Sequence, residues 1–244
     1  MSKQKQIINM FDEISPTYDR LNRVLSFGAD RAWRRNGCLA AFRAFLGGRE
    51  QRDHKARLLV DVATGTGDLI FFWRAAAKKA RVEIKRVIGV DPAKKMLEIA
   101  EKKIGKDAEF IVSEAVKIPL EDNSVDLISI SYGIRNVVEI DKAIKEFYRL
   151  LDCGGILLIL EFMSREKLTI FDRFARLYMK RVLPAIGKLI SKDDLAYKYL
   201  PESIEKFLTK EELETKLQNA GFEIVQIKDE TFKISTRFIA RKPM

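Results

Sequence analysis

The chain has 244 residues, 47% of them hydrophobic, which suits one α/β domain with a buried core. It contains no apolar run of the roughly 18 residues that a membrane-spanning helix needs, and its start, MSKQKQIINMF, lacks the apolar segment of a signal peptide. The formal net charge of +10 favours an anionic partner, with simple solubility as the alternative.

Histidine and cysteine are too few and too scattered for a zinc site. His54 is the only histidine, and Cys38 and Cys153 are the only cysteines and lie far apart. We therefore expect no metal, two reduced thiols and a cytoplasmic protein.

The first part of the chain, residues 1–56, predicts a helical extension. Ile7, Ile8, Phe11 and Ile14 fall on one face of a helix, and Pro16 interrupts that pattern. A second helix is expected roughly over residues 30–45. The polar stretch GGREQRDHK then indicates a surface linker.

From residue 57 onwards, apolar runs alternate with helical patterns. Continuously apolar strands separated by helices indicate a mostly parallel sheet covered on both faces, which is a Rossmann-like α/β fold with seven strands. Residues 57–163 hold the core, residues 164–200 a helical insertion, and residues 201–244 a last helix and two closing strands, all in one domain. The predicted strands are RLLVDVA (57–63), RVIGVD (86–91), AEFIVSEA (108–115), VDLISISY (125–132), GILLILEF (155–162), EIVQIKDE (223–230) and FKISTRFIA (232–240).

The positive charge lies in the flanks of the chain. Residues 1–57 carry 12 basic and 6 acidic groups, residues 58–163 carry 16 and 17, and residues 164–244 carry 17 and 12. The flanks are therefore the parts expected to meet an anionic membrane surface.

The stretch VDVATGTGDLI raises the question of a ligand. Gly65 and Gly67 follow a buried strand, but Ile70 stands where a dinucleotide-binding loop has its third glycine. The carboxylates of Asp61 and Asp68 would repel a phosphate. They suit a cationic ligand with many hydrogen-bond donors, such as S-adenosylmethionine (AdoMet); a plain strand–turn–helix corner is the alternative.

Two further strand ends carry carboxylates. Asp91 ends the second predicted strand, where it can accept hydrogen bonds from ribose hydroxyls, cap the next helix, or do both. Glu114, followed by Ala115, ends the third predicted strand and can meet the amine of an adenine. Since ligands bind at the carboxyl ends of such strands, these residues predict a nucleoside site.

Several stretches together resemble the ubiquinone/menaquinone C-methyltransferase family, class I AdoMet-dependent enzymes that methylate a prenylated quinol. The resemblance implies the class I methyltransferase fold. It also implies that Thr66, Asp91, Glu114, Ala115 and Ser131 touch AdoMet. The matching stretches are FDEISPTYDRLNRVLSFGADRAWRR, LLVDVATGTGDL, GVDPAKKML, IPLEDNSVDLISISYGIRNV, GGILLILEF and DLAYKYLPESIEKF.

The chain departs from the family pattern at several positions. The family usually has His at Asp30, Phe at Tyr132 and Asp or Asn at Glu114. Its C-terminal glycine pair and later His are replaced here by Phe232-Lys233 and Phe238.

The resemblance also places Arg135 and Asn136 beside the acceptor ring. Arg135 is expected to stabilise a developing phenolate and Asn136 to hydrogen-bond it; a structural ion pair is the alternative for Arg135. Asp68, Tyr18 and Asp19 are candidate bases for the phenolic proton, and core packing is the alternative for Tyr18. The expected reaction is C-methylation of demethylmenaquinol to menaquinol, with the ubiquinone-pathway benzoquinol or another small aromatic acceptor as alternatives.

The stretch 168–190, LTIFDRFARLYMKRVLPAIGKLI, mixes apolar and basic residues. We expect it to cover the acceptor site and to contact the inner face of the cytoplasmic membrane; a helix packed on the domain is the alternative. A homodimer is a further expectation. A nucleic-acid methyltransferase is disfavoured because SYGIRN replaces the usual [DN]-P-P-[YFW] motif, and a non-enzymatic AdoMet-binding protein would not need SYGIRN.

Overall fold

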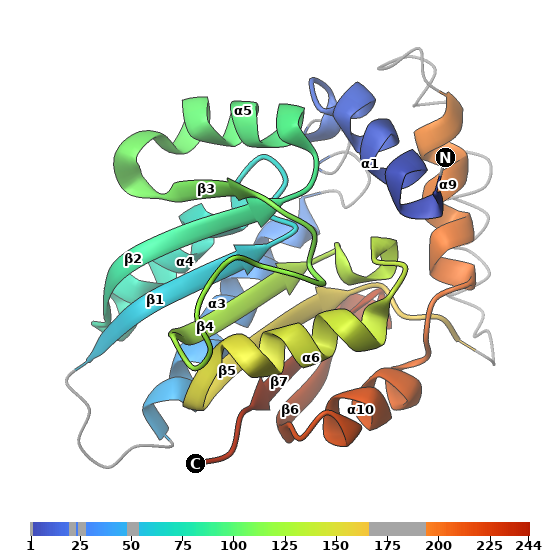
Figure 1. Ribbon diagram of the computed structural model, residues 1–244. Coiled ribbons are helices and arrows are strands. Elements are labelled where there is room, and N and C mark those ends of the chain that lie inside the picture. The colour runs from blue at the N-terminus through green and yellow to red at the C-terminus, as the bar shows by residue number, and fades with distance from the viewer. Residues whose placement is uncertain (1, 20–22, 24–27, 48–53, 166–193) are drawn as a thin grey trace.

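The computed structural model describes residues 2–19, 23, 28–47, 54–165 and 194–244. A seven-stranded sheet forms its centre, in the order β3-β2-β1-β4-β5-β7-β6 (Figure 1). The prediction of seven strands is therefore confirmed. The strands are β1 (Lys55–Val62), β2 (Glu83–Asp91), β3 (Glu109–Val112), β4 (Val125–Ser131), β5 (Leu151–Glu161), β6 (Glu223–Glu230) and β7 (Ser235–Arg241).

The sheet is mostly parallel, as expected from the apolar strands. β1 pairs in parallel with β2 and β4, and β3 and β5 extend the sheet in the same sense. β7 then pairs antiparallel with both β5 and β6. The carboxyl ends of β1, β2 and β4 consequently meet at one edge, where the sequence predicts the nucleoside site.

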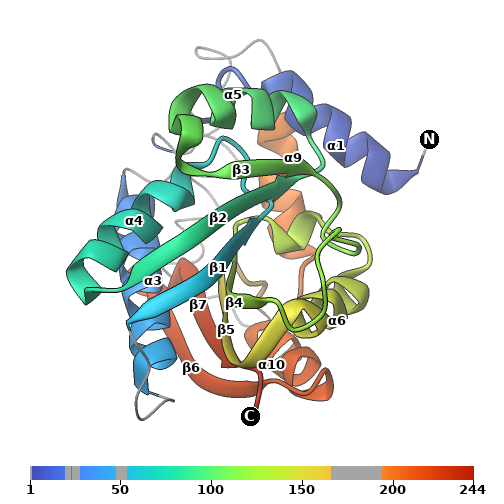
Figure 2. The same ribbon diagram turned by 60° about the vertical axis from the view of Figure 1, so that its left-hand side comes forward.

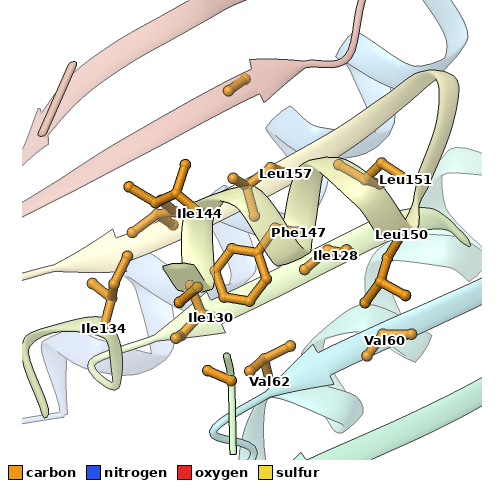
Figure 3. Packing of buried hydrophobic residues seen from close by; sticks show 14 of the residues in the cluster. Val60, Val62, Ile128, Ile130, Ile134, Ile144, Phe147, Leu150, Leu151 and Leu157 are labelled. Carbon is orange, nitrogen blue, oxygen red and sulfur yellow. The ribbon is translucent and has the colours of Figure 1, made fainter. Parts of the chain in front are cut away.

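Helices cover both faces of the sheet (Figure 2). α3 and α4 pack on one face, and α6 and α10 pack on the other. Figure 3 shows how Phe147 and Ile144 of α6 fill the space over Ile128 and Ile130 of β4. The helices are α1 (Lys3–Ile14), α3 (Ala29–Gly47), α4 (Asp68–Ala80), α5 (Lys94–Ile104), α6 (Ile140–Leu150), α9 (Asp194–Glu205) and α10 (Lys210–Asn219), with short 3-10 turns η1 (Gly105–Asp107), η2 (Ile134–Asn136) and η4 (Thr231–Lys233).

α1 lies against α5 and α9 at the edge of the sheet where the parallel strands end (Figure 1). Its apolar face packs on Ala93 and Met96, and Ile7 and Ile14 are buried. The helical pattern expected for this segment is therefore confirmed. Among the described helices, none combines the length and the apolar character that crossing a bilayer requires.

Several boundaries differ from the sequence prediction. β7 begins at Ser235, because residues 231–233 form the turn η4, and β2 begins earlier than predicted, at Glu83. β3 ends at Val112, because Ser113 turns the chain and its hydroxyl donates to the carbonyl of Lys117 at 2.5 Å. β5 begins before Gly154, whose positive φ of 68° lets the strand continue through an irregularity in its pairing. α9 runs past residue 200, the expected end of the insertion. The stretch 168–190 lies outside the described residues.

Candidate active site

An open cavity with about 690 Å³ of empty space lies at the carboxyl ends of β1, β2 and β4. α1 forms one apolar wall, and the loops after the three strands form the other. The residues that α1 contributes are Gln4, Ile7, Ile8 and Phe11.

Asp91 lies in the cavity wall at the end of β2. Its carboxylate accepts the backbone N–H of Gly65 and that of Ala93, both at 2.8 Å. Burial raises the pKa of Asp91 to about 6, although these two hydrogen bonds favour the charged form. Both carboxylate oxygens are already held in place by backbone, so the side chain is preorganised to accept hydrogen bonds from a ligand.

The loops after β1 and β4 touch at the cavity. A Cβ on Gly133 would lie 2.5 Å from the Cβ of Ala63, so only glycine fits there. Ala63 and Tyr132 have positive φ values of 49° and 57°, as does Gly65 at 56°. Non-glycine residues in this region carry backbone strain of roughly 1–3 kcal/mol each, which is typical of chain held in place at a functional site.

Glu114, Ala115 and Ser131 complete the wall on the side of β3 and β4. Glu114 is exposed, whereas Ala115 is buried. Asp91 and Glu114 are the only charged residues that line the cavity in the described part of the chain. An all-acidic wall attracts a cationic ligand and repels a phosphate.

Asp61 lies beneath the loop after β1 and is not part of the cavity wall. It accepts the hydroxyls of Thr64 and Ser129, both at 2.7 Å. Burial raises the pKa of Asp61 to about 6 against these two bonds. Asp61 therefore links the loop after β1 to β4, and its position does not support a direct ligand contact.

Thr66, Gly67 and Asp68 also lie outside the wall. Gly67 is the N-cap of α4, with a φ of 81°. Thr66 donates its hydroxyl to Asp19 at 2.6 Å. Lys103 of α5 forms ion pairs with both Asp19 and Asp68.

This network joins the end of the N-terminal segment to the loop after β1. Burial alone would raise the pKa of Asp19, but the hydrogen bonds from Lys103 and Thr66 outweigh burial and leave that pKa below its ordinary value. Asp19 and Asp68 are therefore held by a cation, and neither faces the cavity as a free base.

Arg135 is also absent from the cavity wall. It pairs with Glu161 at the end of β5, with Nη1 and Oε1 2.6 Å apart, and both side chains are buried. Arg135 also donates from Nη1 to the carbonyl of Tyr132 at 2.7 Å and from Nε to the hydroxyl of Ser203 at 3.4 Å. The structural ion pair, which was the alternative for Arg135, is what the structure shows.

Asn136 and Tyr18, in contrast, line the cavity. The amide oxygen of Asn136 accepts the hydroxyl of Tyr199 at 2.9 Å. Tyr18 stacks edge-on against Phe11, with ring centroids 6.0 Å apart. Asn136 belongs to η2, and Tyr18 belongs to the segment after α1.

Further residues line the cavity: two belong to the SYGIRN loop expected at the site, and two are not singled out by the sequence. Tyr132 and Gly133, Pro92 and Met96 line the cavity, and Tyr132 stacks on Phe162 with centroids 4.7 Å apart. The hydroxyl of Tyr132 lies 3.2 Å from that of Ser235, close to the unusual tail. Burial raises the pKa of Tyr132.

The arrangement can be compared with known proteins. The model of the ubiE/COQ5 methyltransferase family matches residues 1–242. The ubiquinone/menaquinone biosynthesis C-methyltransferase UbiE of Campylobacter jejuni strain 81-176 is 48% identical over 99% of this chain and 100% of its own. The demethylmenaquinone methyltransferase of Bacteroides fragilis strain ATCC 25285 is 35% identical over 98% of this chain and 94% of its own.

A solved structure supports the fold alone. A SAM-dependent methyltransferase from Thermotoga maritima superposes with a TM-score of 0.59 at 22% identity, covering 97% of this chain and 99% of that one. The sheet order, with its antiparallel β7, is thus a Rossmann-like methyltransferase fold, as predicted. The chain belongs to the ubiE/COQ5 methyltransferase family and is a methyltransferase.

Proposed function

We propose that the protein transfers a methyl group from AdoMet to a ring carbon of a prenylated quinol, converting demethylmenaquinol to menaquinol. The observation that carries the proposal is the cavity itself, which has an acidic wall beside an apolar one. The two relatives are named for the same quinone chemistry. The family implies AdoMet as the methyl donor.

The charges of the cavity fit AdoMet, which carries a sulfonium and an ammonium. Asp91 would accept the ribose hydroxyls, since both of its oxygens are fixed by backbone N–H groups of Gly65 and Ala93. Glu114, Ala115 and Ser131 would line the adenine and the remaining part of the donor. Thr66, Gly67 and Asp61 would act by fixing the shape of the loop.

The donor supplies an electrophilic methyl group on a good leaving group, so the protein needs no strong nucleophile of its own. The ring carbon gains the methyl group and loses a proton, and this carbon becomes more nucleophilic as the neighbouring phenolic hydroxyl gives up its proton. The chain must align the ring with the donor, and positioning of this kind can lower the barrier by about 7–11 kcal/mol.

Tyr18 and Asn136 are the two proposed catalytic residues in the wall. The amide oxygen of Asn136 is occupied by Tyr199, and its NH₂ group donates to the carbonyl of Tyr132 at 3.5 Å, which leaves one N–H as the donor for a developing phenolate. Tyr18 lies within the wall, where its hydroxyl can accept the phenolic proton while passing its own proton on to water. Arg135 is neutralised by Glu161, so we assign it the role of positioning η2.

A genetic experiment tests the proposed substrate. A strain that lacks its quinone C-methyltransferase should accumulate demethylated quinone, and the gene for this chain should restore the methylated product. An Asp91→Ala version, expressed to the same level, should restore little. Accumulation that persists with the wild-type gene would contradict the proposal.

A benzoquinol of the ubiquinone pathway is the second candidate acceptor, because the Campylobacter relative is named for both ubiquinone and menaquinone biosynthesis. Quinone profiles of a strain that makes both types distinguish the two acceptors. Cytoplasmic location, peripheral contact with an anionic membrane and a homodimer stay predictions.

A further inference from the structure

A second hollow lies between α3 and the antiparallel strands β6 and β7. It is open to solvent and shares no lining residue with the active-site cavity. We call it the α3–β7 groove. One face of α3 forms its first wall, since the residues that contribute recur at helical spacing: Asn36, Leu39, Ala40, Arg43, Ala44 and Gly47.

Four cations line the α3–β7 groove, namely Arg43, Lys228, Arg237 and Arg241. No aspartate or glutamate is among the described residues that line it. Glu230 pairs with Arg237 at 2.6 Å, and Glu223 approaches Arg241 at 3.7 Å. Neither Arg43 nor Lys228 has an ion-pair partner in the described part of the chain, so the groove keeps an excess of positive charge.

Two of these cations leave hydrogen-bond donors unused. The Nε–H groups of Arg237 and Arg241 are buried and find no hydrogen-bond acceptor among the described residues. Arg237 is only 4% exposed, and its other nitrogens donate to Glu230 and to Gln226, the latter at 3.1 Å. Buried donors without acceptors are rare in proteins, and here they leave part of the positive charge of both guanidinium groups uncompensated.

The positive charges also face one another across the strands. Lys228 is directly opposite Arg237 in the antiparallel pairing of β6 with β7, and such like-charge pairs destabilise a sheet. Burial lowers the pKa of Arg237, Glu230 opposes this, and the nearby charge of Arg43 lowers the pKa further. An anion bound among these groups would remove the repulsion.

We propose that the α3–β7 groove binds the phosphate group of an anionic ligand, either a phospholipid headgroup or a soluble phosphate ester. Phosphate offers several acceptor oxygens to guanidinium donors. The apolar side chains of Leu39 and the exposed Val225 beside the cations suit a ligand that continues into an apolar part. The proposal is independent of the function proposed for the active-site cavity.

The test compares two double variants of the full chain. Arg43→Ala/Lys228→Ala removes two exposed charges from the groove, and Lys78→Ala/Lys79→Ala removes two exposed charges from the end of α4. Inorganic phosphate is titrated calorimetrically at constant ionic strength, and vesicles of phosphatidylglycerol and phosphatidylcholine are used in sedimentation. We expect the groove variant to bind phosphate roughly tenfold more weakly than the wild type, and the control variant to bind like the wild type.

The two probes separate the sources of the phosphate. If the groove variant loses vesicle binding and the control variant keeps it, the ligand is a lipid headgroup. If the groove variant loses phosphate binding but keeps vesicle binding, the ligand is a soluble ester. Equal binding of both probes by the two double variants would overturn the proposal.

The repulsion itself has a separate readout. Lys228→Glu should raise the melting temperature in the absence of phosphate, because attraction to Arg237 replaces repulsion, and should abolish stabilisation by phosphate. A lower melting temperature in this variant would contradict the proposed conflict of charges.

Discussion

Arg135 and Glu161 form a buried ion pair, 2.6 Å between Nη1 and Oε1, that joins the turn after β4 to the end of β5. Burial raises the pKa of Glu161, and the adjacent guanidinium opposes that rise. Arg135 also donates to the hydroxyl of Ser203 in α9. The same helix carries Tyr199, which donates to Asn136. The side chain of Arg135 therefore connects the sheet with the helix that holds Asn136 in place.

Removal of Arg135 should destabilise the protein strongly. Arg135→Ala leaves the Glu161 carboxylate buried without a partner, which typically costs about 3–5 kcal/mol of unfolding free energy. Arg86 offers a matched control, because its pair with Glu109 has the same 2.6 Å separation but is exposed. Arg86→Ala should cost less than about 1 kcal/mol. Urea denaturation measures both; equal losses would contradict the structural role of Arg135.

Asp91 should matter for binding of the donor. Asp91→Ala removes hydrogen bonds from the ribose to a carboxylate, each about 1.5–3 kcal/mol, so AdoMet affinity should fall by one to two orders of magnitude. Calorimetric titration checks this, with circular dichroism as the control for folding. An unchanged affinity in a folded variant would remove Asp91 from the site.

AdoMet binding should weaken as the pH falls through about 6, the raised pKa of Asp91. Below that pH the carboxyl carries a proton and accepts hydrogen bonds less well. Asp91→Asn should bind weakly at every pH and show no such step. If the wild type and the Asn variant gave parallel pH profiles between pH 5 and 7, Asp91 would not be the titrating group.

Asp61 should make the free protein less stable as the pH rises. Its folded pKa of about 6 lies above the ordinary value of 3.8, so the folded state holds the proton more tightly than the unfolded chain. The contribution of Asp61 to stability is therefore fully present below pH 4 and is lost as the pH rises through 6. The slope of unfolding free energy against pH between these values should therefore be more positive in Asp61→Asn than in the wild type; identical slopes would contradict this.

Tyr199 should act on turnover through Asn136. Tyr199→Phe removes a hydrogen bond of roughly 0.5–1.5 kcal/mol and frees the amide to rotate. We expect turnover to fall up to about tenfold while AdoMet affinity stays within a few-fold. Tyr148→Phe, which removes a hydroxyl on α6, is the matched control and should behave like the wild type. A loss of AdoMet affinity in Tyr199→Phe would show that the tyrosine shapes the donor site instead.

Local patterns in the sequence predict the strand ends well. Apolar runs identify the parallel strands, and parallel strands end at one edge of the sheet. The sequence alone therefore predicts that Asp91, Glu114 and Gly65 lie close together, and all three line the cavity. The apolar face of α1 was also visible, but periodicity does not say what such a face packs against.

Partners from distant parts of the chain could not be predicted. Glu161 lies 26 residues after Arg135, and Tyr199 lies 63 residues after Asn136. Only the folded sheet and α9 bring these pairs together. The same holds for Asp61. The sequence predicts that its carboxylate contacts the ligand, but in the structure the carboxylate accepts hydrogen bonds from Thr64 and Ser129.

The most direct test of the proposed function is methyl transfer by the purified protein. Labelled AdoMet is supplied with a reduced demethylmenaquinone, with the same quinone in its oxidised form, and with RNA, and the products are identified by mass spectrometry. We expect the wild-type protein to form a C-methylated quinol from the reduced quinone only, and the Asp91→Ala variant to form little product at limiting AdoMet. Methylation of RNA, or equal methylation of the oxidised quinone, would contradict it.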